Sequence, residues 1–166
     1  MPATLAGRIQ LSQSIAYQSA LDNQTVNADL ARIIAVEFAN GTGNGQANAM
    51  FSDYRALGSG ASENLDLAGV LTDAFGTVLT FTKIKAIVIE SDDANTVDIT
   101  VGNHATAAFL GPFGAAAHTL AVQPGGLIVL AAPKTGWAVT ATTADLIKVL
   151  AGAAAVNYRI HLIGTV

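Results

Sequence analysis

The sequence predicts an all-β fold, and three observations support this prediction. Short runs rich in β-branched residues recur along the chain, and several of them alternate with polar residues. Turn-forming clusters separate about eight to ten such runs at intervals of roughly 8 to 12 residues, the spacing of sandwiches and barrels. A long small-residue connection at 104–117 favours a jelly roll over a simple meander. We therefore expect a jelly-roll-like antiparallel β-sandwich with an extended N-terminal arm.

The first 30 residues show no single sustained period. A short strand followed by an extended arm is the simplest interpretation, and such an arm could reach over a neighbouring subunit; a frayed terminus is the alternative. We divide the chain into an N-terminal arm or short strand (1–30) and a single β-sandwich domain (31–166). The apolar residues of the arm stand among Gln, Ser and Asn: Ile9, Leu11, Ile15, Tyr17 and Leu21.

A glycine-rich segment at 40–45 lies between two predicted strands, residues 31–38 and a returning strand at 49–55. A glycine-rich loop can cradle phosphate when it joins a strand to a helix and carries a lysine. No Lys follows here, and the next segment does not resemble an amphipathic helix. We therefore favour a flexible hairpin loop.

The central stretch, Leu79–Val101, holds two strand patterns around a polar break. Residues 83–89 alternate in part and are rich in β-branched side chains, and residues 97–101 alternate strictly. The short polar side chains of 91–95 favour a turn between them. We predict a β-hairpin at the centre of the domain. Further strands are expected at 65–67, 118–122, 127–132, 137–140, 146–150 and 156–164.

Composition indicates that other protein covers part of the surface. Hydrophobic residues make up 51% of the 166 residues and charged residues only 12%, about half the usual charged share. A monomer of this size normally needs more charge to cover its surface. We therefore favour an oligomer or assembly subunit over an alanine-rich but ordinary monomer.

The charge of the chain and its N-terminal sequence argue against several classes of protein. The net charge is −4 and the eight Lys and Arg are spread thinly, which argues against direct nucleic-acid binding. The absence of cysteine excludes disulfides and thiolate metal sites. The N-terminus lacks a signal-peptide core, and no run approaches the roughly 20 apolar residues of a membrane helix. We expect a soluble chain made in the cytoplasm, without membrane contact.

The histidines do not predict a metal site. His104, His118 and His161 stand in three different segments, and none has a second ligand at i+2. A zinc or iron site on a jelly roll typically needs His-x-His or a nearby carboxylate on one strand.

The carboxylates likewise do not predict a metal site or a catalytic site. Asp92, Asp93 and Asp98 could form part of a calcium site, but their spacing fits no EF-hand loop, and a solvated hairpin tip is the simpler interpretation. Glu63 and Asp66 could in principle do acid–base work, although nothing places them in a cleft.

Nucleophilic catalysis and sugar binding have equally weak signals. The serines lack a G-x-S-x-G elbow. Trp137 and Tyr158 could line a sugar-binding face, but two aromatic residues are more often core or interface residues. We predict a non-enzymatic protein with no catalytic, cofactor-binding or metal-binding residues.

Residues 51–67 resemble a recurring pattern of tailed-bacteriophage structural proteins, in which a strand ending in an arginine, here Arg55, precedes a small-residue turn and an Asp-Leu pair. The likeness covers roughly residues 47–164. It continues through 71–89, 99–102, the Gln-Pro-Gly-Gly turn at 123–126, 140–149 and 158–164.

This resemblance implies a non-enzymatic virion component, most like a capsid decoration (cement) protein. Such proteins are similar in size, often jelly rolls and commonly trimeric, and they sit over junctions between capsid subunits. The expected partners are therefore the major capsid protein and further copies of this chain, and the expected location is the capsid surface. A charge-poor subunit that buries several faces at once fits this role.

Two other functions stay open. A receptor- or glycan-binding module of a tail or head fibre would use the same sandwich to present loops, with Trp137 or Tyr158 exposed. A cupin-like enzyme is a weaker third possibility.

Overall fold

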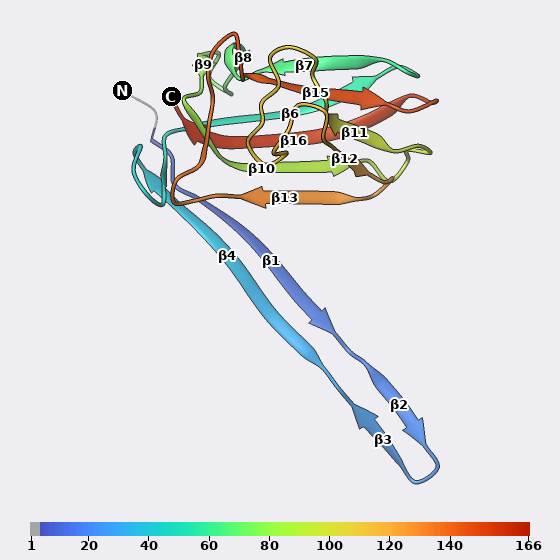
Figure 1. Ribbon diagram of the computed structural model, residues 1–166. Coiled ribbons are helices and arrows are strands. Elements are labelled where there is room, and N and C mark those ends of the chain that lie inside the picture. Colours follow the sequence, from blue (N-terminus) through green and yellow to red (C-terminus); the bar gives the residue numbers. More distant parts are fainter. Residues whose placement is uncertain (1–3) are drawn as a thin grey trace.

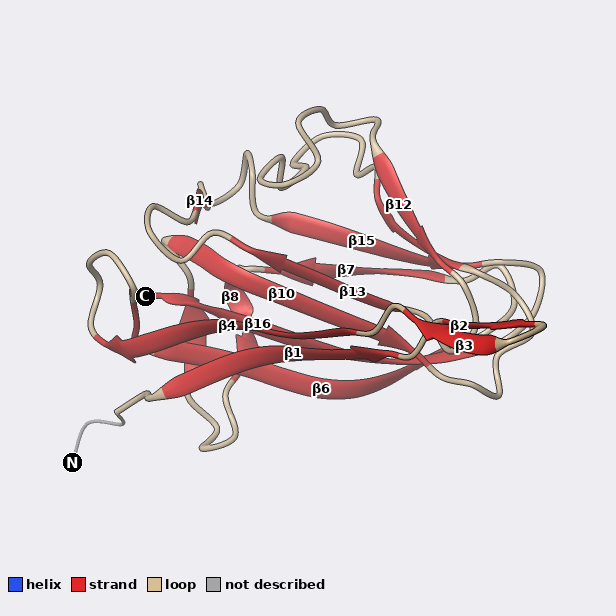
Figure 2. Cartoon of the chain, turned by 90° about the horizontal axis from the view of Figure 1, so that it is seen from below, coloured by secondary structure: helices blue, strands red, loops and turns tan. Residues whose placement is uncertain are grey.

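The computed structural model describes residues 4–166, which form sixteen β-strands and no helix (Figure 1). The all-β prediction is confirmed. Most strands build a body of two layers, and four strands form a long hairpin that projects from it (Figures 1 and 2). We call this hairpin the arm.

The layer next to the arm is a five-stranded sheet, which we call the arm-side sheet. Its order is β13-β10-β16-β6, and β14 pairs with β10. All of its pairings are antiparallel. Its strands are β6 (Ala49–Leu57), β10 (Lys83–Ser91), β13 (Leu127–Ala131), β14 (Trp137–Ala138) and β16 (Val156–Thr165).

The second layer, the far sheet, has the order β12-β11-β15-β7 and is antiparallel throughout. A small hairpin of two further strands closes one end of the body (Figure 1). The strands of this layer and of the small hairpin are β7 (Ser62–Asp66), β8 (Ala68–Thr72), β9 (Val78–Thr80), β11 (Ile99–Gly102), β12 (Thr119–Val122) and β15 (Leu146–Ala151).

Alternation along the strands builds one core between the two sheets. On β16, every second residue from Val156 to Leu162 is almost completely buried, and β15 shows the same period. Because alternate side chains of a strand point to opposite faces, each sheet gives one face to the core and one to the outside. The core draws on both sheets, with Phe51, Ile87, Ile89, Ile160 and Leu162 from the arm-side sheet and Leu65, Ile99, Val101, Ile147 and Val149 from the far sheet.

The predicted central hairpin is wrong, because its two strands lie in different sheets. Strand β10 pairs with β13, β14 and β16, whereas β11 pairs with β12 and β15. The intervening segment crosses between layers and is held there by the buried side chain of Asn95. Its amide nitrogen donates to Ser91 Oγ and to the Asn157 carbonyl, and its oxygen accepts from the Asn157 N–H at 2.8 Å.

The predicted hairpin of residues 31–38 with 49–55 is also wrong. Strand β4 (Leu30–Asn40) pairs antiparallel with β1 (Gly7–Ile15) and briefly, in parallel, with β5 (Gln46–Ala47). Strand β6 instead pairs along its whole length with β16. Most of β4 therefore belongs to the arm, which extends beyond the predicted division at residue 30.

A polar contact ties the two sheets together at the β6 edge. The hydroxyl of Tyr158, a residue with no exposed surface, donates to Glu63 Oε1 at 2.8 Å. Arg55 Nε donates to the other oxygen of Glu63 at 2.7 Å. Burial, and then the bond to Glu63, raise the pKa of Tyr158 above its usual value. Since Glu63 lies on β7 and its partners lie on β16 and β6, this contact fixes how the sheets sit on each other.

We expect Tyr158→Phe to lower the free energy of unfolding by about 1–3 kcal/mol, because it leaves a carboxylate oxygen of Glu63 without its donor. Tyr54→Phe is the matched control, since it removes an exposed hydroxyl bonded to Asp92. We expect no measurable change for the control. Urea denaturation of both variants tests this, and equal effects would contradict a special role for the buried contact.

Candidate functional site: the arm and the outer face of the arm-side sheet

The arm is one hairpin with a single register along its length. Strands β1 and β4 form its base, and β2 (Gln18–Leu21) and β3 (Gln24–Asn27) form its tip. The pairing runs from Gly7↔Phe38 at the base to Leu21↔Gln24 beside the tip without a shift of register. A backbone hydrogen bond from Ala28 N–H to the Tyr17 carbonyl bridges the short break between the two halves.

This register sorts the arm into an apolar and a polar face, because directly opposite residues of an antiparallel pair share a face. The polar face holds Arg8, paired with Glu37, and one large apolar exception, Ile33. The apolar face is interrupted by the polar pair Gln13↔Arg32 and carries two more polar side chains near the tip, Ser19 and Gln24. Its large apolar residues are Ile9, Leu11, Ile15, Tyr17, Leu21, Val26, Leu30, Ile34, Val36 and Phe38.

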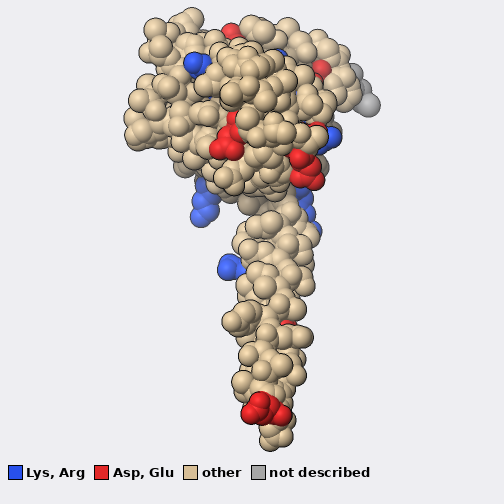
Figure 3. All heavy atoms as spheres, turned by 90° about the vertical axis from the view of Figure 1, so that its right-hand side faces the viewer, with Lys and Arg blue, Asp and Glu red and all other residues tan. Residues whose placement is uncertain are grey.

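Most of this apolar face is exposed. The exposed fractions of its large residues beyond the base range from 41% for Ile34 to 71% for Tyr17. Figure 3 shows an arm with few charged atoms, with acidic ones close to the tip. A two-stranded ribbon of this kind is marginally stable alone in water, and both of its edges offer unpaired backbone groups. The arm therefore presents both an apolar face and unpaired backbone edges to its surroundings.

The base of the arm packs on the body. Phe38 and Ala47 form a small buried cluster with Ala86 and Ile163, and Val36 packs against it. Ala86 and Ile163 lie opposite each other on β10 and β16. They point away from the main core, so the apolar face of the arm begins on the outer face of the arm-side sheet.

Lys85 joins the loop that follows β4 to the loop that follows β13. It lies at an irregularity of β10, is 1% exposed, and its Nζ donates to the carbonyls of Gly43 at 3.3 Å, Pro133 at 3.4 Å and Lys134 at 2.7 Å. The Gly45 N–H also donates to Pro133. Burial, and then the charge of Lys83, lower the pKa of Lys85.

The rest of the sheet's outer face carries both apolar and charged side chains. Beyond Ala86 and Ile163, two cross-strand rows run across the four strands. The first row is Ser52, His161, Val88 and Val129, and the second is Tyr54, Arg159, Glu90 and Leu127. Four large apolar residues of this face are 41–55% exposed, namely Met50, Tyr54, Leu127 and Val129.

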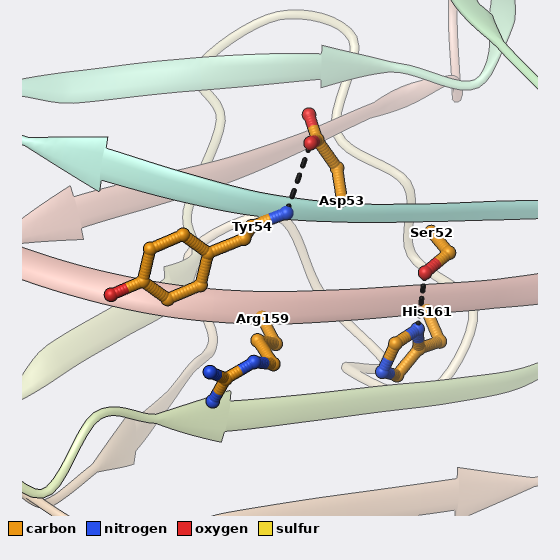
Figure 4. Close-up of a pocket in the computed structure, with 5 residues that line it drawn as sticks. All are labelled: Ser52, Asp53, Tyr54, Arg159 and His161. Carbon is orange, nitrogen blue, oxygen red and sulfur yellow. Dashed lines mark hydrogen bonds between the residues drawn. The ribbon is translucent and has the colours of Figure 1, made fainter. Parts of the chain in front are cut away.

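A shallow depression of about 300 Å³ lies on this face (Figure 4). Ser52 Oγ and His161 Nδ1 are 2.8 Å apart, and the guanidinium of Arg159 stacks 4.8 Å from the ring centre of Tyr54. Asp53 lines the depression but accepts the Tyr54 N–H at 2.9 Å. Within residues 4–166 no carboxylate bonds His161, so the Ser–His pair lacks the orienting acid of a catalytic triad. The group offers hydrogen bonds and an aromatic surface.

The three histidines are not brought together. His104 Nδ1 accepts the Ala107 N–H at 3.3 Å, and His118 Nδ1 donates to the Phe113 carbonyl at 2.7 Å. His161 lies on the outer face of the arm-side sheet. Across the described part of the chain, no three His, Asp or Glu side chains are grouped to hold a metal ion.

The predicted acidic residues have separate structural partners. Asp92 accepts the Ala94 N–H at 3.0 Å and the Tyr54 hydroxyl at 3.0 Å, and the backbone bond is the main cause of its lowered pKa. Asp66 accepts the Ala68 N–H at 2.8 Å, away from the Arg55–Tyr158 contact that holds Glu63.

The two aromatic candidates are not on one exposed face. Tyr158 is fully buried, and Trp137 is partly buried against the main core. The exposed aromatic residue of the outer face is Tyr54, which sequence reasoning missed.

Sequence reasoning also missed the apolar face of the arm, although a signal was present. Apolar residues stand at odd positions before Asp22-Asn23 and at even positions after it, mirrored about that pair. Such mirrored alternation is the pattern of a hairpin with one apolar face.

A scan against protein-family models, a search of curated proteins and a search of solved structures each found no match. No helix long and apolar enough to cross a membrane is present among residues 4–166.

The variant Lys85→Met tests whether the hydrogen bonds of Lys85 hold the loop after β4 at the base of the arm. The variant keeps the side-chain length but loses three donated hydrogen bonds, so we expect the Gly45 amide to exchange with deuterium roughly tenfold faster. Lys83→Met is the control, because Lys83 is exposed on the same strand. Equal exchange in both variants would show that Lys85 does not hold this loop.

The lowered pKa of Lys85 also predicts a pH dependence. Between its folded pKa and the value of about 10.4 in an unfolded chain, the unfolded state binds more protons. This group therefore adds stability as pH rises through that window and adds least below the folded pKa. We expect Lys85→Met to lose this alkaline gain relative to the wild type in denaturation series across pH, and parallel curves would contradict it.

Proposed function

We propose that this protein is a non-enzymatic virion component of a tailed bacteriophage, a decoration (cement) protein that binds the outer shell and stabilises contacts between major capsid subunits. The observation that carries the proposal is the arm, whose exposed apolar face projects from the two-layered body (Figure 1). The resemblance of residues 47–164 to phage structural proteins supports the virion setting.

The arm has the physical properties of a staple between subunits. Seven large side chains of its apolar face are at least 41% exposed: Leu11, Ile15, Tyr17, Leu21, Val26, Leu30 and Ile34. Burying a half-exposed side chain of this size stabilises an assembly by about 1 kcal/mol, so the arm offers several kcal/mol to a neighbour. Each copy in contact with a neighbour would lower the free energy of the shell and oppose outward pressure from packaged DNA.

We also propose that the body is a jelly-roll-like sandwich that assembles as a trimer. Both sheets are antiparallel, share one core and are built mostly from strands distant in sequence. This order supports a jelly roll rather than a meander. The low charge of the surface supports burial of several faces in an oligomer.

A glycan- or receptor-binding module of a phage fibre is the second candidate. The group of Tyr54, Arg159 and His161 favours it, because sugars are bound by an exposed aromatic ring flanked by hydrogen-bonding side chains (Figure 4). This function needs a sugar-dependent interaction and few copies per particle.

Shortening the arm tests the main proposal. Because the register is unbroken, residues 12–33 can be replaced by an Asn-Gly turn joining Leu11 to Ile34, which keeps the anchored base. We expect this variant to fold but to occupy capsids at a small fraction of the wild-type level. Quantitative mass spectrometry of purified particles gives the copy number relative to the major capsid protein.

The wild-type copy number separates the candidates. A number comparable to that of the major capsid protein supports a decoration protein, a handful of copies supports a fibre module, and absence from particles contradicts both. Full occupancy by the shortened variant would remove the arm from the proposal.

A further inference from the structure

The apolar face of the arm and the outer face of the arm-side sheet meet at the base of the arm and diverge from there. In Figure 2 the arm passes across the same side of the body as β6, β10 and β16, and in Figure 1 it leaves that side and diverges. The apolar face of the arm meets the sheet at its base, where Phe38 packs with Ala86 and Ile163. Beyond this contact, the apolar residues of the arm and of the sheet face are exposed.

We propose that the apolar face of the arm docks on the outer face of the arm-side sheet of a second copy of this chain. The inference rests on the arm being an assembly element, as proposed above, but not on the protein being part of a virion. It names the neighbour that receives the arm and the surface on which the arm lies.

The contact at the base shows that the two surfaces fit chemically. There, large apolar side chains of the arm lie on small and branched residues of the sheet, Ala86 and Ile163. The uncovered part of the same sheet face continues with Val88, Val129 and Leu127. An arm from another copy would extend a packing arrangement already present within each chain.

Charge favours the same pairing. Arg32 is the only charged residue on the apolar face, and within residues 4–166 it forms no ion pair. On the outer face of the sheet, Arg159 pairs with Glu90 at 3.4 Å, and Asp92 bonds the hydroxyl of Tyr54. Around the second row the acidic groups Glu90 and Asp92 therefore outnumber the basic Arg159, and this part of the surface suits an arriving arginine. Packing two arms against each other would instead bring two Arg32 residues to the same apolar interface.

The area is sufficient for a stable complex. At about 3.4 Å per residue, residues 11–21, beyond the base, span roughly 37 Å, and a ribbon of about 10 Å width then covers roughly 370 Å². In a two-fold pair each copy donates one arm and receives another, so about 740 Å² per partner would be covered, close to the roughly 800 Å² per partner of a standard interface.

Adjacent isoleucines of β4 give a matched test. Ile34→Asp places a charge on the apolar face, and Ile33→Asp places the same charge on the polar face at a more exposed position. On the receiving surface, Val129→Asp is paired with Val70→Asp, an exposed valine of β8. Unchanged circular dichroism and urea midpoints verify folding of each variant.

We expect sedimentation equilibrium to show an oligomer for the wild type and for both controls. Ile34→Asp and Val129→Asp should each weaken association roughly tenfold or more. Mixing these two variants should restore one contact per pair and give a heterodimer, because one copy keeps an intact sheet and the other an intact arm. Arms that pack on arms would leave Val129→Asp unaffected, which would overturn the proposal.

The lack of cysteine permits a direct geometric check. Copies carrying only Ile34→Cys, mixed with copies carrying only Val129→Cys or Leu127→Cys, should form disulfides between chains under mild oxidation. A monomer at all concentrations with no crosslink would overturn the proposal. Arm-dependent binding to the major capsid protein in that case would leave the proposed function standing and assign the arm to the capsid.

Discussion

A two-stranded ribbon cannot cover its own apolar face, because both strands lie in one layer and nothing stands opposite them. The arm of this protein has that form, with large apolar residues such as Leu11 and Ile34 facing one side over most of its length. Burial of apolar surface is the main favourable contribution to folding and association. The exposed face of the arm therefore leaves apolar surface that association would bury, and contacts at its base hold the arm against the body.

The body provides a rigid base for the arm. Its core is closed between two sheets, and the buried contact of Tyr158 with Glu63 fixes the layers against each other. The base of the arm is then attached in two ways, by the apolar cluster around Phe38 and by Lys85, which donates to Gly43 in the loop after β4 and to Lys134 in the loop after β13. Burying a lysine destabilises a fold unless its N–H groups find acceptors. Here the acceptors are carbonyls of the two loops beside the arm base, so the bonds of Lys85 also hold these loops in place.

The sequence predicted strands well and their partners poorly, and the difference has a physical reason. Alternation is local, so segments such as 83–89 and 156–164 could be recognised as strands from the sequence alone. Pairing depends on loop paths, which local patterns do not determine. The segment after Ser91 resembles a hairpin turn, but the hydrogen bonds of Asn95 to Ser91 and Asn157 carry it across to the other sheet.

The pairing of the arm strands was also not predicted from the sequence. Its apolar positions were visible, but spacing along one strand could not show that they share a face with residues of a second strand. The mirrored alternation about Asp22-Asn23 contains that information and extends the arm to Asn40. The group of Tyr54 and Arg159 had no comparable signal, because its members lie on strands β6 and β16, far apart in sequence.

We infer that association covers the apolar face of the arm. Hydrogen–deuterium exchange of the arm peptides, measured over a range of protein concentrations, tests this inference. We expect fast exchange throughout residues 11–34 at high dilution, where the ribbon stands alone, and strong protection at concentrations that allow assembly, with the body protected in both. Equal protection of the arm at every concentration would contradict the claim, because it would show a ribbon that needs no partner.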